Sequence, residues 1–189
     1  MANIYLAFIF DLDLATVIYC MITTNKSWYA VYTKSRAEKK VLLELELQKI
    51  EAYLPLQKKL RQWSDRKKWV ETPLISGYIF VHISKFDYDR VLQAAGVVSY
   101  VQFEGKAANI PNEQIKAIKR LLRQHDYEVE VSLQNYCASD LIEITAGPLM
   151  GLKGTLITLK GKKRVAIHIT QLNLALSVEL PLHEIQKAI

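Results

Sequence analysis

The feature that most constrains this chain is a glycine-rich stretch, ITAGPLMGLKGTLITLKGKKRVAIHI, which holds four of its seven glycines: Gly147, Gly151, Gly154 and Gly161. Glycine permits sharp turns and close approach of backbones, and the intervening Thr, Val and Ile residues favour strands. Hairpin turns alone would account for the glycines. However, short strand-like runs recur about every ten residues from LIEIT to LALSVEL. This pattern predicts a small antiparallel barrel over 139–189, whose glycine-rich corner meets another macromolecule.

The region before it alternates strand-like and helix-like segments. We expect strands and extended runs at 27–33, 51–63, 69–84 and 97–105, and helices at 35–50, 85–96 and 110–124. Ser35 and Glu38 have the spacing of a capping box, and a turn at 64–68 joins a hairpin. The order predicts an α+β fold, an antiparallel sheet flanked by helices over 26–124. The polar residues 125–138 read as a linker.

Residues 1–25 form an apolar segment to which we assign no function. Asp11 and Asp13 interrupt it, and neither apolar run is long enough for a membrane span. It is an extra strand or helix, or it lies upstream of a true start at Met21. The two cysteines, Cys20 and Cys137, lack C-x-x-C spacing, so we expect a reducing, cytoplasmic compartment and no membrane contact.

The composition favours an acidic partner, and the sequence shows no motif typical of an enzyme. The formal net charge is +6 and the pI is near 9.2, which suits a polyanion or an acidic protein surface. We find no nucleophile with a base, no P-loop, and no metal-ligand spacing among the four histidines. We therefore expect a protein that is not an enzyme and holds no cofactor and no metal.

Six basic residues flank the predicted hairpin turn. They are Lys58, Lys59, Arg61, Arg66, Lys67 and Lys68. On a projecting arm they could reach nucleic-acid phosphates, or they could keep a solvated edge from aggregating. Trp63 and Trp69 lie among them and could stack on bases or face each other across the hairpin. Both interpretations stay open.

The runs SWYAVYT and SGYIFV are dense in aromatic residues. Alternation places Tyr78 and Phe80 on one side of their strand. One face of the sheet must pack on helices. The aromatic residues are then either all core, or a surplus on the other face marks a docking site.

Four segments together resemble the NusG family of transcription elongation factors. They are SWYAVYTKSRAEKKV, TPLISGYIFVHI, GVVSYVQFEGKAANIPNEQI and ITAGPLMGLKGTLITL, in that order. The resemblance covers Lys26 to Ile189, and its last part is similar to the KOW motif, with Gly147, Gly151 and Gly154. It implies a NusG-type N-terminal (NGN-like) domain followed by an SH3-like KOW barrel.

The resemblance also implies partners. In this family an apolar concavity binds the clamp helices of the largest catalytic subunit of RNA polymerase and suppresses pausing. The matching positions here are Trp28, Tyr32, Ile75, Tyr78 and Phe80. Lys34, Ser35 and Arg36, with Lys40 one turn on, match the region near upstream and non-template DNA. Nascent RNA is a further candidate partner, and we expect a monomer.

Two departures point to a specialised paralogue similar to RfaH or the UpxY-type antiterminators of polysaccharide loci. Ile75-Ser76-Gly77-Tyr78 replaces an aromatic and a proline of the family pattern, and Leu172 stands where general members carry an exposed aromatic that meets a second protein partner. The strand-forming composition of 155–170 favours a barrel over the helical hairpin known for RfaH. A general NusG factor and a ribosomal KOW-type RNA-binding protein remain the alternatives.

Overall fold

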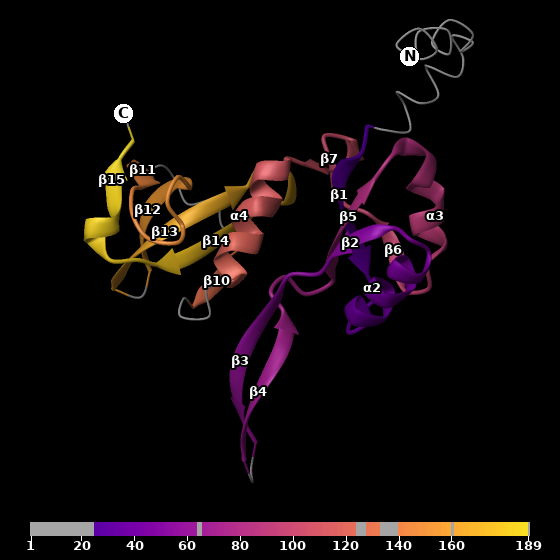
Figure 1. Ribbon diagram of the computed structural model, residues 1–189, viewed down its shortest axis with the longest axis horizontal. Helices are drawn as coiled ribbons and strands as arrows, with labels where there is room; N and C mark the ends of the chain where they lie inside the picture. The colour runs from indigo at the N-terminus through magenta and orange to yellow at the C-terminus, as the bar shows by residue number, and fades with distance from the viewer. Residues whose placement is uncertain (1–24, 64–65, 124–127, 133–139, 160, 189) are drawn as a thin grey trace, which may run out of the picture.

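The computed structural model describes residues 25–63, 66–123, 128–132, 140–159 and 161–188 and contains two larger antiparallel sheets with a helix between them (Figure 1). Of the predicted segment 1–25, only Asn25 lies within these ranges. Both cysteines lie outside them. The helices are α2 (Glu38–Leu47), α3 (Tyr88–Gln93) and α4 (Asn112–Arg123), with short 3₁₀ turns η1 (Lys85–Asp87), η2 (Thr170–Leu172) and η3 (Leu182–Glu184).

The N-terminal sheet has the order β2-β5-β1-β6, and β9 also pairs with β1. Its strands are β1 (Ser27–Thr33), β2 (Glu51–Tyr53), β5 (Tyr78–Ile83), β6 (Val97–Tyr100) and β9 (Asn109–Ile110). The short strands β7 (Gln102–Phe103) and β8 (Lys106–Ala107) pair separately. Since all these pairings are antiparallel and helices accompany the sheet, the predicted α+β arrangement of this region is confirmed.

Helices α2 and α3 cover one face of this sheet. Val41 of α2 and Val91 of α3 share an apolar cluster with Val31 and Ile79 of the central strands. The predicted capping box is wrong: α2 begins at Glu38, three residues later than expected, and its N-cap position, Ala37, makes no side-chain bond. Glu38 is buried and accepts a hydrogen bond from the Gly77 N–H instead (2.9 Å), so a tertiary contact replaces the local cap.

The predicted hairpin is present as β3 (Leu56–Gln62) paired with β4 (Lys67–Pro73). It projects from the molecule as a two-stranded arm (Figure 1). The single extended run expected at 69–84 is in fact two strands in different sheets, β4 and β5. The bend between them includes Gly77, whose φ of 77° favours glycine.

The C-terminal sheet has six antiparallel strands in the order β10-β14-β13-β12-β11-β15. They are β10 (Val129–Ser132), β11 (Leu141–Ile144), β12 (Lys153–Leu159), β13 (Lys162–Ile169), β14 (Leu174–Glu179) and β15 (Ile185–Lys187). The four runs predicted from the glycine spacing correspond to β11 to β14. The order leaves β10 and β15 at the ends of the sheet, and barrel closure stays an expectation.

Strand β10 lies inside the predicted linker 125–138, so that stretch is not wholly a connector. Val129 is buried, and Glu130 Oε2 lies 3.1 Å from Nη1 of Arg164. Arg164 is only 5% exposed, so it requires a nearby anion. This ion pair joins β10 to β13 across the intervening strand β14.

The structure explains why glycine occurs at three positions of the glycine-rich stretch. A Cβ at Gly154 would lie 2.6 Å from the carbonyl oxygen of Ala166 on β13. Gly154 is therefore required by close approach of two strands, whereas Gly147 and Gly151 have positive φ angles of 78° and 83° and serve turns.

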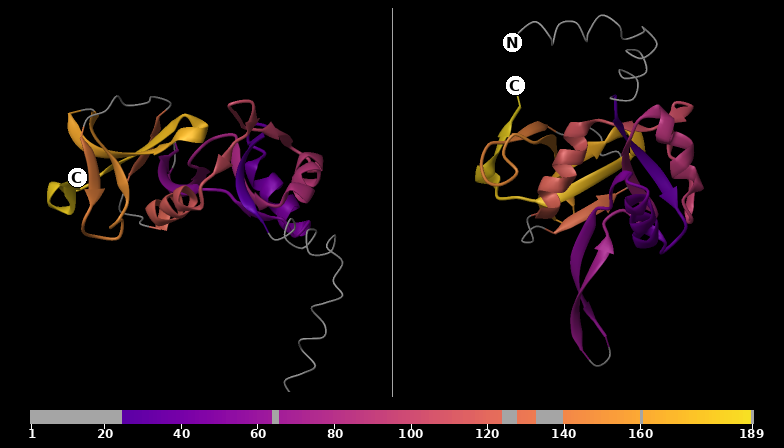
Figure 2. Two further views of the ribbon diagram at one scale, coloured as in Figure 1. Left: turned by 90° about the horizontal axis from the view of Figure 1, so that it is seen from above. Right: turned by 45° about the vertical axis from the view of Figure 1, so that its right-hand side comes forward.

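Helix α4 lies between the two sheets (Figure 2). Ile115, Ile118 and Leu121 belong to one continuous apolar cluster that also includes Phe80 of the N-terminal sheet and Leu176 of the C-terminal sheet. A side-chain hydrogen bond, from Gln57 Nε2 to the Val129 carbonyl oxygen (3.1 Å), also joins the two halves. The two halves thus share a core in this arrangement.

Candidate docking face and basic surfaces

The second face of the N-terminal sheet carries the aromatic residues singled out from the sequence. The register of β1 and β5 places Trp28 opposite His82, Ala30 opposite Phe80, and Tyr32 opposite Tyr78. Directly opposed side chains of an antiparallel pair lie on the same face. We call these six residues, together with Ile75, the docking face.

Exposure varies along the docking face. Trp28 (5%), Ile75 (4%) and Phe80 (0%) are covered, whereas Tyr32 is 38% exposed and Tyr78 is half-buried. The predicted polymerase contacts therefore divide into a covered group and an open end formed by two tyrosines.

The two tyrosines at the open end contact each other. Their ring centroids lie 4.8 Å apart, and the Tyr78 hydroxyl donates to the Tyr32 hydroxyl (3.0 Å). Burial raises the pKa of Tyr78 well above its usual value of 10.0, and the hydrogen bond to Tyr32 raises it further. Tyr78 is thus neutral at physiological pH, as suits an apolar contact with one polar edge.

The covered end of the docking face is closed by residues of the same chain. The Lys119 ammonium of α4 lies 5.0 Å from the centre of the Trp28 ring, and Ile115 and Ile118 join the same cluster. Turn η2 lies against β7 of the N-terminal half. Its residue Leu172, predicted to contact a second protein, is only 7% exposed and belongs to the shared cluster.

A basic turn lies at the open end of the docking face. Lys34 and Arg36 follow β1 directly, Lys40 lies in the first turn of α2, and all three are exposed. The Thr33 N–H donates to the Gly77 carbonyl (2.9 Å), which connects this turn to the loop before Tyr78. The structure therefore brings the predicted DNA-contacting turn beside the tyrosine pair.

The two faces of the β3–β4 arm differ in chemistry. The register pairs Lys59 with Val70 and Arg61 with Lys68, and alternation adds Trp63 and Arg66 to this face. We call it the basic face. The opposite face pairs Lys58 with Glu71, Leu60 with Trp69, and Gln62 with Lys67. The six predicted basic residues are exposed but divide between the two faces.

Trp63 and Trp69 lie on opposite faces of the arm, with 57% and 65% of their surfaces exposed. They therefore do not face each other across the hairpin. Trp69 is opposed by Leu60, itself 49% exposed.

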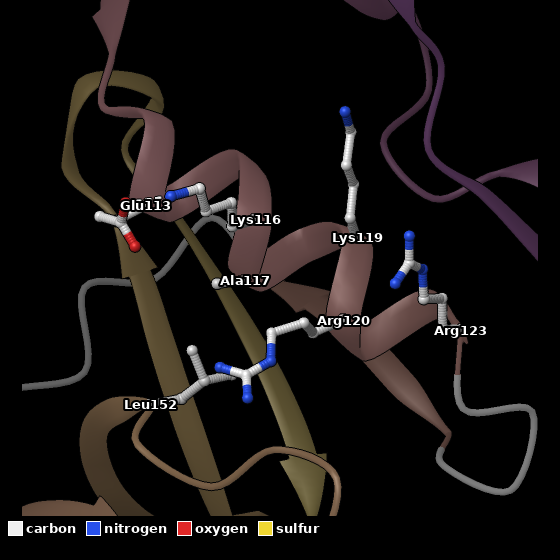
Figure 3. A pocket seen from close by; sticks show the side chains of 7 residues that line it. All are labelled: Glu113, Lys116, Ala117, Lys119, Arg120, Arg123 and Leu152. Atoms are coloured by element: carbon white, nitrogen blue, oxygen red, sulfur yellow. Dashed lines mark hydrogen bonds and ion pairs between the residues drawn. The ribbon is translucent and has the colours of Figure 1, made fainter.

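Helix α4 carries a group of basic residues to which the sequence analysis assigned no role. They are Lys116, Lys119, Arg120 and Arg123 (Figure 3). Their spacing of three and four residues within a predicted helix indicates one basic surface, since such residues are neighbours on a helix.

No group of three or more potential metal-ligating side chains occurs within the described ranges. None of the helices in those ranges is long and apolar enough to cross a membrane. The docking face and the basic surfaces are therefore the candidate functional features.

Comparison with known proteins identifies the N-terminal domain. A family model described as "Transcription termination factor nusG" matches residues 26–119, which include the docking face, the arm and most of α4. This domain, residues 26–119, belongs to the NusG family. Members of this family are transcription factors rather than enzymes.

Two relatives extend the likeness beyond this domain. The transcription termination/antitermination protein NusG of Halalkalibacterium halodurans is 23% identical over 180 residues, covering 86% of this chain and 99% of the relative. A solved structure titled "Domain interaction in Thermotoga maritima NusG" is similar with a TM-score of 0.51 and 23% identity, covering 88% of this chain and 99% of that one. This similarity supports a NusG-like fold across both halves.

Proposed function

We propose that this protein is a transcription antitermination and elongation factor that binds RNA polymerase through the docking face and suppresses pausing and termination. The observation that carries the proposal is the open tyrosine pair, Tyr32 and Tyr78, beside a basic turn, within the domain matched by the NusG family. No catalytic step is required, since the factor acts by binding.

The proposed partner is the clamp-helix coiled coil of the largest catalytic subunit of RNA polymerase. Exposed aromatic side chains at the centre of an interface typically anchor such contacts. The turn carrying Lys34 and Arg36 would then approach upstream or non-template DNA, because it adjoins the same end of the sheet.

Full use of the docking face requires the C-terminal sheet to separate from it. Trp28 and Phe80 are buried under the shared cluster, so a coiled coil cannot reach them in the docked arrangement. We propose that the tyrosine pair makes the first contact and that the C-terminal sheet then leaves, freeing the apolar residues and its own Leu172 for a second protein partner.

The basic face of the arm is the proposed nucleic-acid contact. Arg61 and Lys68 lie directly opposite each other, which is unfavourable for like charges. A phosphate backbone, of DNA or nascent RNA, would relieve this repulsion. The opposing face, with Glu71 beside Lys58, lacks such a concentration of charge.

The finer proposal is a role at specific operons, such as polysaccharide loci. It rests on Ile75-Ser76-Gly77-Tyr78 and Leu172, where the sequence departs from the family pattern. Genome-wide occupancy tests it: the protein should accompany polymerase on few operons. Occupancy of most transcribed genes would instead indicate a general factor.

Polymerase binding is tested with two variants of one residue. Tyr78→Ala removes the ring and should weaken binding to purified RNA polymerase by roughly 1–3 kcal/mol. Tyr78→Phe keeps the ring and loses the hydrogen bond to Tyr32, so it should lose less. Binding is measured after nuclease treatment, which excludes tethering through nucleic acid. A folded Tyr78→Ala protein that binds normally would remove the docking face from the proposal.

The arm is tested by comparing its faces. Neutralising Lys59, Arg61 and Lys68 with glutamine should weaken nucleic-acid binding and reduce its salt dependence by roughly one unit per lost phosphate contact. The matched control neutralises Lys58 and Lys67 on the opposite face. Equal effects of the two sets, per charge removed, would argue against a dedicated basic face.

A further inference from the structure

The basic residues of α4 line an open groove of about 400 Å³ between this helix and Leu152, the residue before β12. Lys116 and Arg120 form one row, and Lys119 and Arg123 form another, since residues four apart are neighbours on a helix. Arg120 extends toward Leu152 of the C-terminal half, whereas Lys119 and Arg123 extend toward the N-terminal half (Figure 3). The helix thus presents cations on both sides of its exposed surface.

The described lining of this groove holds four cations and one carboxylate. Its one acidic side chain, Glu113, is 2.7 Å from the Lys116 ammonium. Lys119 lies over the rings of Trp28 and Tyr53 at 5.0 and 4.9 Å. Arg120 and Arg123 are exposed, and neither has a carboxylate partner among the residues that the structure describes. Two exposed guanidinium groups therefore line the groove, where an external anion can reach them.

A second groove continues the first toward the arm. It shares Lys119 and Arg123 with the first groove and is also lined by Tyr53, Leu54 and Leu56. Leu56 is the first residue of β3, at the base of the arm, and alternation places it on the face of Lys58. Its neighbour Gln57 lies on the basic face with Lys59. The second groove therefore reaches from the α4 cations to the base of the arm, where the basic face begins.

We infer that α4 and the basic face of the arm form one binding track for the phosphate backbone of a nucleic acid. The inference rests on the nucleic-acid role proposed for the arm and adds α4 to it. Lys116 and Arg123 are seven residues apart, about 10 Å along the helix axis. This length corresponds to about three phosphates of one duplex strand, at about 3.4 Å of axis each.

The lining of the groove favours a phosphate backbone over a protein helix. Its apolar lining consists of Leu152 and the buried Ala117. Protein interfaces are usually anchored by buried aromatic or large apolar side chains. Arginine, in contrast, forms bidentate bonds with phosphate oxygens.

The test compares two double variants of the full chain. Arg120→Gln with Arg123→Gln removes the two exposed guanidinium groups of the groove. Lys85→Gln with Lys163→Gln removes the same charge from η1 and β13, outside the groove and the arm. Binding to a labelled single-stranded RNA and to a labelled DNA duplex is measured by fluorescence anisotropy at several salt concentrations, with circular dichroism as the check on folding.

The groove variant should lose two phosphate contacts. The slope of log K against log salt should fall by about 1.8 for the duplex or about 1.4 for the single strand. Raising the salt from 50 to 200 mM lowers duplex affinity in both proteins. The factor of this loss should be about 12 times smaller for the groove variant than for the unmodified protein. The probe that shows the change identifies the form of nucleic acid.

Other results separate the inference from the proposed function. If the groove variant matches its control on both probes while neutralising Lys59, Arg61 and Lys68 weakens binding, the arm stands and the inference about α4 is overturned. If neither set weakens binding, both are overturned. If the groove variant instead loses nuclease-treated RNA polymerase, the groove is a protein contact, and the inference is overturned.

Discussion

Leu172 offers a direct test of whether the C-terminal sheet restricts access to the docking face. The perturbation is Leu172→Ala. The side chain is 7% exposed, lies in the shared apolar cluster, and belongs to a turn placed against β7. Truncating a buried leucine to alanine costs roughly 2–5 kcal/mol. If about 2 kcal/mol of this loss destabilises the docked arrangement, the fraction of molecules whose C-terminal sheet has left the docking face rises about 30-fold.

Apparent affinity for RNA polymerase should rise by the same factor of about 30, as long as the docked arrangement still predominates. The assay is equilibrium binding between purified protein and purified polymerase, with no other partner present. Hydrogen exchange of the C-terminal strands shows whether the sheet itself remains folded.

Ile157→Ala is the matched control. Ile157 is 6% exposed on β12 but belongs to a small cluster with Ala166 and Ala175, separate from the shared core. Its truncation should destabilise the sheet without changing polymerase affinity. A folded Leu172→Ala protein that binds no more tightly than this control would refute the idea that the sheet competes with polymerase.

Three further predictions concern stability. Gly154→Ala should destabilise the C-terminal sheet by roughly 1–3 kcal/mol in urea unfolding, because the added Cβ would meet the Ala166 carbonyl at 2.6 Å; an unchanged midpoint would contradict this close approach. Glu130→Ala should cost roughly 3–5 kcal/mol in the same assay, because it leaves Arg164 buried without its nearest anion, and a neutral result would show that the more distant Glu179 suffices. Burial raises the pKa of Tyr53 to about 12, partly offset by Arg123. Because the folded state holds this proton more tightly, its contribution to stability is complete below pH 10 and is lost as pH rises toward about 12. Tyr53→Phe should flatten that decline in unfolding experiments across this range, and an unaltered pH profile would exclude Tyr53 as the cause.

Local patterns in the sequence were sufficient for much of the secondary structure. The alternation in β5 correctly places Tyr78 and Phe80 on one side of their strand, because strand periodicity is a property of neighbouring residues. The glycine spacing likewise predicts β11 to β14. These features depend on interactions within a few residues of each other or across short turns.

Features set by distant partners could not be predicted in this way. Glu38 has the spacing of a capping box, but its carboxylate bonds to Gly77, which is 39 residues away. Val129 and Glu130 read as linker because their partners, β14 and Arg164, lie far along the chain. The α4 cations were visible at helical spacing, but their groove depends on Leu152 and on the base of the arm.

The docking face shows why sequence could predict an apolar contact but not its occupant. Trp28 and Phe80 require an apolar cover, and the shared cluster with the C-terminal sheet satisfies that requirement as well as a coiled coil would. Hydrophobic contact is not directional, so the two covers can replace each other if their free energies are close. In the proposed mechanism, the exposed Tyr32 is the point at which a competing partner binds before the cover departs. Exchange of this kind requires a cover held mainly by apolar burial, and the Leu172→Ala experiment measures that property.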